Sequence, residues 1–218
     1  MRPNIAIDGP SAAGKSTISD ILALRLGYTH LDTGAMYRAV AYGAFKSGLP
    51  FDAEEAIAKM IENMKLVIHP DGKVFLDGED ISNEIRTNEM SMGASDVSKL
   101  GKVREALVEM QRRIAADGGY IVDGRDIGTV VLKDAKVKIF LTASAEDRAK
   151  RRVKQNLEKG LPADYDAILE DIIKRDYQDT HRTISPLKKA DDAIEIDSSK
   201  MSIEEVVDTI IEIVKKNS

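Results

Sequence analysis

Gly9-Pro10-Ser11-Ala12-Ala13-Gly14-Lys15-Ser16 is the stretch that decides the fold of this chain. It fits the pattern G-x-x-x-x-G-K-[ST], in which glycines let the backbone turn tightly and its N–H groups surround a phosphate. Residues 4–8 before it read as a short buried strand, and residues 15–26 after it have helical periodicity that ends at Gly27. This strand–loop–helix context predicts that the loop binds a nucleoside triphosphate.

The loop offers different groups to the phosphates and to a metal ion. Lys15 can reach the β- and γ-phosphates, the hydroxyl of Ser16 can bind Mg²⁺, and the helix N-terminus adds partial positive charge. A glycine turn without a ligand is the alternative, and the complete pattern in its required context disfavours it. We expect the following residues to bind ATP: Gly9, Pro10, Ser11, Ala12, Ala13, Gly14, Lys15, Ser16 and Thr17.

The rest of the chain continues the alternation of strands and helices. Apolar runs predict strands at residues 28–32, 120–123, 137–141 and 193–196, and helical periodicity predicts helices at 36–46, 145–159, 165–177 and 203–215. This rhythm is typical of an α/β fold with a parallel sheet.

The middle of the chain breaks this rhythm. Residues 66–68 and 74–76 are apolar runs on either side of Pro70-Asp71-Gly72, a turn sequence that predicts a hairpin. Helices are expected on both sides of the hairpin, at 53–64 and 97–116. We therefore interpret the antiparallel piece as an insertion into the parallel fold.

Composition and charge exclude several classes of protein. The chain has 43% hydrophobic and 32% charged residues, as globular domains do, and no cysteine, which excludes thiol catalysis, zinc–thiolate sites and disulfides. Its net charge of −5 argues against a nucleic-acid partner. The apolar start is interrupted at Asp8, unlike a signal peptide, and no stretch reaches the ~20 apolar residues of a membrane span. A cytoplasmic protein without a membrane partner is expected.

The phosphate loop predicts a ligand and leaves the reaction open. Switch GTPases also need D-x-x-G and N-K-x-D elements, and neither pattern occurs in the sequence; the signature loop of transporter ATPases is absent too. Small-molecule kinases remain as the main class. Two alternatives stay open: a kinase of another small molecule, such as another nucleotide or shikimate, and a nucleotide-dependent switch or adaptor that binds a partner.

Further segments carry a resemblance to a known family. They are Leu-Asp-Thr-Gly-Ala-Met-Tyr-Arg at 31–38, Asp-Gly-Arg-Asp-Ile-Gly-Thr-Val-Val at 123–131, the strand at 137–143 with the arginines after it, and residues 175–176 with 181–187. In this order, and over almost the whole chain, they resemble the cytidylate kinases of bacteria. The inserted hairpin fits as well, because bacterial members carry an extra small sheet. Thr33 stands where serine is also found and keeps the hydroxyl group.

The resemblance implies a P-loop kinase with a central parallel sheet flanked by helices, an inserted small antiparallel subdomain on the monophosphate side, and a helical lid. It implies one kinase domain over residues 1–218, with the monophosphate-binding side at 33–115 and the lid and ribose-side helices at 145–182. The implied activity is Mg²⁺-dependent transfer of the γ-phosphate of ATP to CMP and dCMP, in pyrimidine nucleotide metabolism. A monomer is expected.

The same resemblance assigns roles to individual side chains. The residues implied in catalysis are Lys15, Arg125, Arg151, Arg152 and Arg182. The residues implied in CMP binding are Thr33, Arg38, Ser95, Arg104, Arg125, Asp126, Arg175, Asp179 and Arg182. Ser16 is expected to bind the metal directly and Asp123 through water. Guanidinium forks suit phosphate oxygens, and a carboxylate with an arginine suits the amine and the acceptors of cytosine.

Each assignment has a simpler alternative. Asp123 can be an ordinary turn aspartate. Solvent exposure on a polar helix face is the alternative for Arg38, Ser95, Arg104, Arg148, Arg151 and Arg152. The mechanism expected from the resemblance needs no general base, because an acceptor phosphate is already ionised at neutral pH. Catalysis would then consist of positioning and charge stabilisation.

Overall fold

The computed structural model describes residues 2–69, 71–158 and 160–217. Pro70 of the expected turn and Lys159 of an expected helix lie outside these ranges. The chain divides into two compact units, one formed by Met1–Tyr28 with Gly118–Ser218 and the other by Thr29–Asp117. In the part of the chain that is described, no helix combines the length and apolar character needed to cross a membrane.

The first unit is built on the parallel sheet. The sheet has five strands, and four of them belong to this unit in the order β6 (Tyr120–Gly124), β1 (Ile5–Asp8), β7 (Val137–Thr142) and β8 (Ile194–Asp197). Ile7 of β1 lies opposite Asp123 on one side and Ile139 on the other, both in parallel register. Every residue of β1 is buried, as in a central strand with both faces covered. The parallel sheet confirms the predicted α/β fold.

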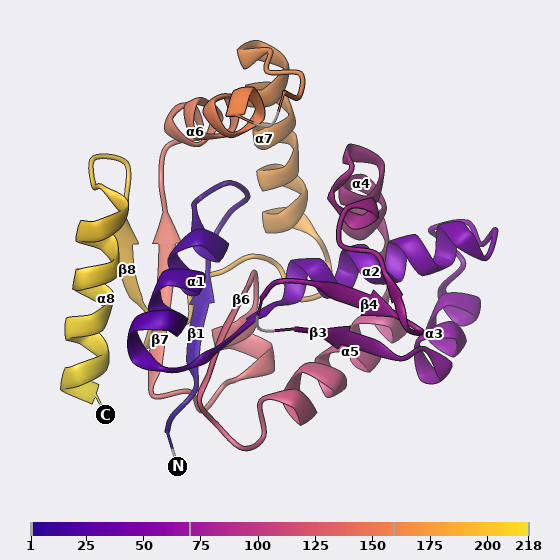
Figure 1. Ribbon diagram of the computed structural model, residues 1–218, viewed down its shortest axis with the longest axis horizontal. Coiled ribbons are helices and arrows are strands. Elements are labelled where there is room, and N and C mark those ends of the chain that lie inside the picture. The colour runs from indigo at the N-terminus through magenta and orange to yellow at the C-terminus, as the bar shows by residue number, and fades with distance from the viewer. Residues whose placement is uncertain (1, 70, 159, 218) are drawn as a thin grey trace. The chain divides into compact units, whose positions relative to one another are not determined.

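Two helices of the first unit pack on this sheet and on each other, α1 (Lys15–Leu26) and α8 (Ile203–Asn217). Figure 1 shows them running alongside the strands. Ile18 and Leu22 of α1 are buried in one core with residues of β1, β7 and α8, on the face that the periodicity predicts. α1 ends at Gly27, whose left-handed backbone (φ 67°) lets its N–H bond to a carbonyl of the last turn. This core fixes the helix that starts at the phosphate loop.

The segments that follow β6 and β7 start at the carboxyl ends of the strands. β6 leads into the π-helical turn Ile127–Val131. β7 leads into α6 (Ala145–Glu158), which packs against α7 (Tyr165–His181), and Figure 1 shows both helices beyond the tip of β7. α7 runs on to His181, past the end predicted at 177. Ligands of parallel α/β sheets bind at this end of the strands.

The second unit combines helices with a small antiparallel sheet. Its elements are β2 (Thr29–Asp32), α2 (Thr33–Lys46), α3 (Glu54–Asn63), β3 (Leu66–Ile68), β4 (Val74–Leu76), β5 (Glu79–Asp80), the short 3-10 helix Glu84–Arg86, α4 (Asn88–Val97) and α5 (Gly101–Ile114). β3 and β4 pair antiparallel with Leu66 opposite Leu76, which confirms the predicted hairpin. α2 packs on this sheet through Ala35 and Ala39.

The helix predicted at 97–116 is present as α5, but its start is wrong: α5 begins at Gly101, and residues 98–100 separate it from α4, which was not predicted. The hydroxyl of Ser98 donates to the carbonyl of Ser95 at 2.8 Å, so a side chain competes with the backbone where α4 ends. Ser95 and Arg104 therefore lie on two different helices.

Candidate functional site

The phosphate loop follows a backbone course that only small residues permit. Gly9 and Gly14 have φ values of 152° and 93°. A Cβ atom on Gly9 would lie 2.0 Å from the carbonyl oxygen of Leu141 on β7, so no larger residue fits without moving the backbone. The loop is thereby held against the neighbouring strand, at the carboxyl end of β1.

Lys15 folds back onto this loop. Its Nζ donates to the carbonyl oxygens of Gly9 at 2.7 Å and Pro10 at 2.8 Å, and the residue is 7% exposed. Burial, and after it the charge of Arg125, lower the pKa of Lys15 to about 7, against the opposing effect of nearby carboxylates such as Asp123. Because burial disfavours the charged form of Lys15, an anion that binds nearby stabilises its ammonium group.

Ser16 and Asp123 form a pair of oxygen ligands beside the loop. The Ser16 hydroxyl, in the first turn of α1, donates to Oδ2 of Asp123 at 2.8 Å. Asp123 is 2% exposed and lies within β6, so it is a buried strand residue rather than a turn residue. A hydroxyl and a carboxylate are the kinds of group that Mg²⁺ binds, so the donor set fits the expected metal.

Arg125 follows β6 directly and is held by a carboxylate of α7. Its Nε donates to Oδ2 of Asp179 at 2.7 Å, and the two side chains are 20% and 13% exposed. Burial acts to raise the pKa of Asp179, but the charges of Arg125, Arg175 and Arg182 outweigh it and lower that pKa below its usual range. The guanidinium group is therefore fixed by an ionised partner.

Arg182 and Asp126 form a second buried pair. Nη2 of Arg182 lies 3.7 Å from Oδ1 of Asp126, and both side chains are less than a tenth exposed. The Nε of Arg182 donates to the carbonyl of Ser185 at 2.7 Å, which orients the guanidinium plane. Two arginine–aspartate pairs thus lie in the first unit, each with a member in the segment 124–126 that follows β6.

Arg148 of α6 is buried, so the solvated-face interpretation is wrong for it. Its Nε donates to the carbonyl of Ala143 at 2.9 Å, Nη1 to the carbonyl of Ser11 at 3.1 Å, and Nη2 to Oδ2 of Asp176 at 2.6 Å. One side chain therefore joins the end of β7, the phosphate loop and α7.

The next two arginines of α6 have different surroundings. Nη1 of Arg151 donates to the hydroxyl of Ser198 at 3.0 Å and to the carbonyl of Ala13 at 3.5 Å. Arg152 is exposed, as the solvated-face alternative describes. The helical spacing of these residues thus does not give them a common environment.

In the second unit, Arg38 is held at the start of α2. Asp32 caps this helix by accepting from the N–H of Ala35 at 2.9 Å, and its other oxygen accepts from Nη2 of Arg38 at 3.1 Å. The neighbouring Thr33 is buried. The Nε of Arg38 is buried and has no hydrogen-bond partner in the described part of the chain. The Arg38 side chain is 26% exposed, so it is partly buried rather than fully solvated. Buried donors without a partner are uncommon in proteins.

Arg104 is also buried, at 3% exposure. Its Nη1 donates to the carbonyl of Ser98 at 3.3 Å, and its guanidinium carbon lies 5.8 Å from the ring centre of Tyr37, within reach of a cation–π interaction. Ser95 is half-buried on α4, which packs against α2. The solvated-helix interpretation is therefore wrong for Arg104, and Tyr37 joins its surroundings.

The predicted site residues thus divide between the two units, and the residues of each unit are called a group below. The group of the first unit contains the phosphate loop with Lys15, Ser16 and Thr17, together with Asp123, Arg125, Asp126, Arg151, Arg152, Arg175, Asp179 and Arg182. The group of the second unit contains Thr33, Arg38, Ser95 and Arg104.

Sequence reasoning missed three carboxylates that hold other groups in place. Asp32 orients Arg38, Asp176 orients Arg148, and Asp8 accepts from two backbone amides. Each of them lies inside or next to a segment that the sequence analysis singles out. The available signal was an acidic residue beside a conspicuous arginine or glycine, which many loops also contain.

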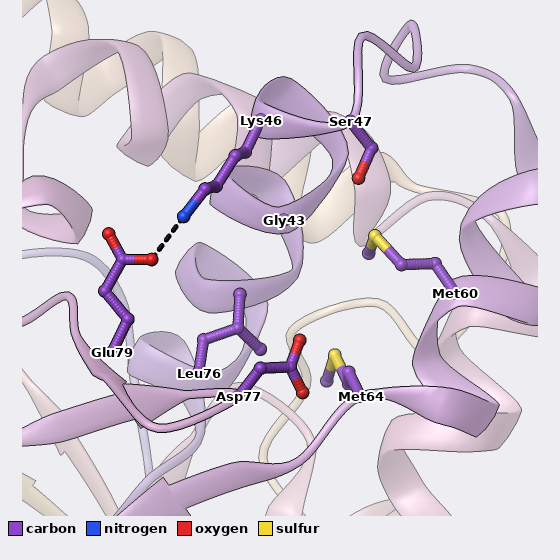
Figure 2. Close-up of a pocket in the computed structure, with 8 residues that line it drawn as sticks. All are labelled: Gly43, Lys46, Ser47, Met60, Met64, Leu76, Asp77 and Glu79. Carbon is purple, nitrogen blue, oxygen red and sulfur yellow. Dashed lines mark hydrogen bonds and ion pairs between the residues drawn. The ribbon is translucent and has the colours of Figure 1, made fainter.

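A cavity of about 160 Å³ lies elsewhere in the second unit, near the other end of α2. Figure 2 shows the thioethers of Met60 and Met64 and the side chain of Leu76 around it, with the ion pair between Lys46 and Glu79 at its edge. Its lining contains none of the predicted site residues. Its polar lining is formed by Lys46, Ser47, Asp77 and Glu79; because Lys46 is already paired with Glu79 and Asp77 is a carboxylate, the cavity offers little to a phosphate.

Comparisons with known proteins agree on one family. A family model described as cytidylate kinase matches residues 5–216. The chain is 50% identical to a cytidylate kinase from Geobacillus sp. (strain WCH70), with 99% of each chain covered. It is 47% identical to that of Bacillus subtilis (strain 168), covering 99% of this chain and 97% of the relative, and 52% identical to that of Caldicellulosiruptor bescii, covering 98% and 96%.

Similar solved structures are more distant in sequence. An uncharacterized protein from Eubacterium ventriosum has a TM-score of 0.55 at 13% identity, with 98% of this chain and 99% of that chain covered. Shikimate kinase from Bacteroides thetaiotaomicron has a TM-score of 0.50 at 12% identity, with 98% of each chain covered. At such identities the similarity concerns the fold alone, and it agrees with the P-loop kinase fold.

Proposed function

The chain belongs to the cytidylate kinase family, and from this premise we propose how its own residues carry out the reaction. The activity is the transfer of the γ-phosphate of ATP to CMP or dCMP, which gives ADP and the nucleoside diphosphate. The proposal assigns the steps of this transfer to the two groups of residues described above.

The observation that carries the assignment is the set of buried arginines held by carboxylates. Arg125 bonds to Asp179 and Arg182 lies beside Asp126, so both guanidinium groups have fixed positions. Fixed positive charge stabilises a phosphate dianion and the charge that develops during its attack. We assign Arg125 and Arg182 to the acceptor phosphate, and Arg38 of the second unit to the same group.

The donor side consists of the phosphate loop. The N–H groups of residues 9–17 would surround the β-phosphate, and Lys15 would leave the loop carbonyls for the β- and γ-phosphate oxygens. Burial weakens the hydration of this ammonium, so its interaction with transferring charge is strong. Arg151 and Arg152 would add charge from α6, Arg151 from a position against the loop itself.

Mg²⁺ would be held by the Ser16 hydroxyl directly and by Asp123 through water, a donor set of hard oxygens that suits this ion. When bound, the ion would neutralise part of the negative charge of the nucleotide phosphates. The hydroxyl of Ser16 already points at the carboxylate of Asp123, which orients both oxygens before a nucleotide arrives.

The base and the ribose would be bound by the remaining residues. We assign the cytosine to Ser95, Arg104 and Asp126, and the ribose to Arg175 and Asp179. A carboxylate accepts from the N4 amine of cytosine, and an arginine donates to its ring acceptors. The cation–π contact of Arg104 with Tyr37 supports this role, because it restricts a long side chain before binding.

No general base is assigned, because the acceptor phosphate is ionised at neutral pH and no proton has to be removed before it attacks. The chain would contribute alignment and charge stabilisation alone. We propose that residues 33–115 form the monophosphate side, that 145–182 close over the phosphates and exclude water, and that the enzyme works as a cytoplasmic monomer.

The test is a coupled assay of ADP formation with CMP, dCMP, UMP, shikimate or no acceptor. CMP and dCMP should give the fastest turnover, and Lys15→Ala should nearly abolish it in a folded protein, since in the proposal this residue would contact transferring charge. Lys133→Ala, at an exposed lysine, is the matched control and should change nothing. The proposal would be refuted if shikimate alone stimulated ADP formation, or if ADP formed as fast without an acceptor.

A further inference from the structure

Asp8 is a buried carboxylate at the end of β1, and none of the steps above uses it. It is 4% exposed and directly precedes Gly9 of the phosphate loop. Its Oδ1 accepts from the N–H of Ile127 at 2.7 Å and its Oδ2 from the N–H of Gly128 at 2.8 Å. One side chain therefore joins the strand before the phosphate loop to the turn after β6.

In the described part of the chain, no carbonyl of the turn itself accepts from the amides of Ile127 and Gly128. The first N–H groups of any helix lack a carbonyl within the helix. Here the bonds of the π-helical turn begin with the N–H of Val130, which donates to the carbonyl of Asp126 at 2.8 Å. Asp126 precedes the turn, but its side chain does not cap it. Asp8 supplies the cap from another strand, and the carboxylate of Asp126 lies beside Arg182.

Gly128 lets this carboxylate approach. A Cβ atom at this position would lie 3.3 Å from Oδ2 of Asp8 and 3.2 Å from Cδ of Lys138, tighter than nearly all such contacts. The backbone of Gly128 is not in the left-handed region. The space it leaves, rather than its conformational freedom, is what the contact with Asp8 requires.

Burial makes the ionised form of Asp8 less favourable than it would be in water. Burial raises the pKa of Asp8 to about 6; the amides of Gly128 and Ile127 oppose this effect, the charge of Asp126 adds to it, and that of Lys15 opposes it. Lys138, whose side chain also lies close to Gly128, forms an ion pair with Asp192 at 2.7 Å. At neutral pH both oxygens of Asp8 therefore accept hydrogen bonds.

We infer that Asp8 is a positioning residue for phosphoryl transfer, which fixes the turn at Ile127 and Gly128 and through it the places of Arg125 and Asp126. Arg125 and Asp126 lie between the end of β6 and the turn, so a turn that shifts carries them with it. The inference rests on the proposed function, which puts these two residues at the acceptor nucleotide.

Asp8→Asn tests it, because asparagine has the same size but places an amine against one of the two amides. Turnover should fall about tenfold or more and the KM for CMP should rise, while the KM for ATP changes less than about twofold. Amide hydrogen exchange at Ile127 and Gly128 should become faster. Asp192→Asn, which removes the exposed carboxylate beside Lys138, is the matched control and should alter neither the kinetics nor this exchange.

Gly128→Ala provides a second variant should Asp8→Asn fold poorly, and it should give the same pattern in weaker form. Equal loss for both substrates would indicate a merely structural role and overturn the inference. Faster exchange with unchanged kinetics would also overturn it. Arg125→Ala distinguishes the role of Asp8 from the proposed function, because full activity of that variant would refute the proposed function itself.

Discussion

Binding of ATP at pH 8 should be accompanied by uptake of about one proton, and Lys15 should be the group that takes it up. The pKa of Lys15 is lowered to about 7 in the protein without nucleotide, mainly by burial. About nine tenths of these amines are then neutral at pH 8. A polyphosphate beside the amine favours its charged form, so binding should draw in ~0.9 proton per ATP. With an ordinary pKa of 10.5 the uptake would be close to zero.

The measurement is titration calorimetry in two buffers of different ionisation enthalpy, such as Tris and HEPES, at pH 8 and without an acceptor. The phosphates of ATP are almost fully ionised at this pH, since their last pKa lies near ~6–7. The slope of the observed enthalpy against the ionisation enthalpy of the buffer gives the number of protons. Linkage gives the sign of a second effect: the affinity for ATP should fall as the pH rises from 8 to 9, by up to about tenfold.

Lys15→Arg is the control, because a guanidinium stays charged at these pH values. Its proton uptake should drop to nearly zero, and its affinity should be independent of pH between 8 and 9. Uptake below ~0.2 proton by the wild-type protein would refute the reasoning about Lys15. The same uptake in Lys15→Arg as in the wild type would assign the proton to another group.

Three further outcomes are expected. Asp126→Asn should lower the ratio of kcat/KM for CMP over UMP by roughly tenfold to a few hundredfold, because the amide can donate to the uracil carbonyl where the carboxylate cannot. Asp179→Ala should reduce the free energy of unfolding by about 3 kcal/mol and raise the KM for CMP, since it leaves Arg125 buried without its partner. Because the pKa of Asp8 is raised in the folded state, ionised Asp8 destabilises the fold above pH ~6; the urea stability of the wild type relative to Asp8→Asn should therefore increase as the pH falls from 7 to 5.

Each of these outcomes has a result that contradicts it. An unchanged CMP to UMP ratio would remove Asp126 from the group that reads the base. Asp191→Ala, at an exposed aspartate, is the control for Asp179→Ala, and equal stability of the two variants would refute the argument from the buried pair. A stability difference between wild type and Asp8→Asn that does not vary with pH would show that Asp8 titrates near its ordinary value.

The sequence is informative wherever the pattern is local. The phosphate loop, the helix after it and the hairpin around residue 72 depend on neighbours a few positions away, and the structure has all three. The break at 98–100 was missed; at this position the hydroxyl of Ser98 bonds to the backbone of the preceding turn, a contact that the apolar periodicity does not reveal.

The surroundings of the site residues depend on contacts between distant parts of the chain. Ser16 bonds to a residue 107 positions away, and Asp8 to one 119 positions away. Arg148 and Arg152 have the same side chain on the same helix, yet the first is buried and the second exposed. The residues that pack against α6 cause this difference in exposure. The sequence pattern of the helix alone does not predict it.

The anchoring of α6 has a mechanical consequence. Arg148 and Arg151 tie the first half of this helix to the phosphate loop through Ser11 and Ala13. In the described residues 152–158 no hydrogen bond to the phosphate loop is found, and Leu157 is 66% exposed. The closure of α6 and α7 proposed above would therefore move the outer half of α6 together with Arg152, while Arg148 and Arg151 keep their contacts with the loop.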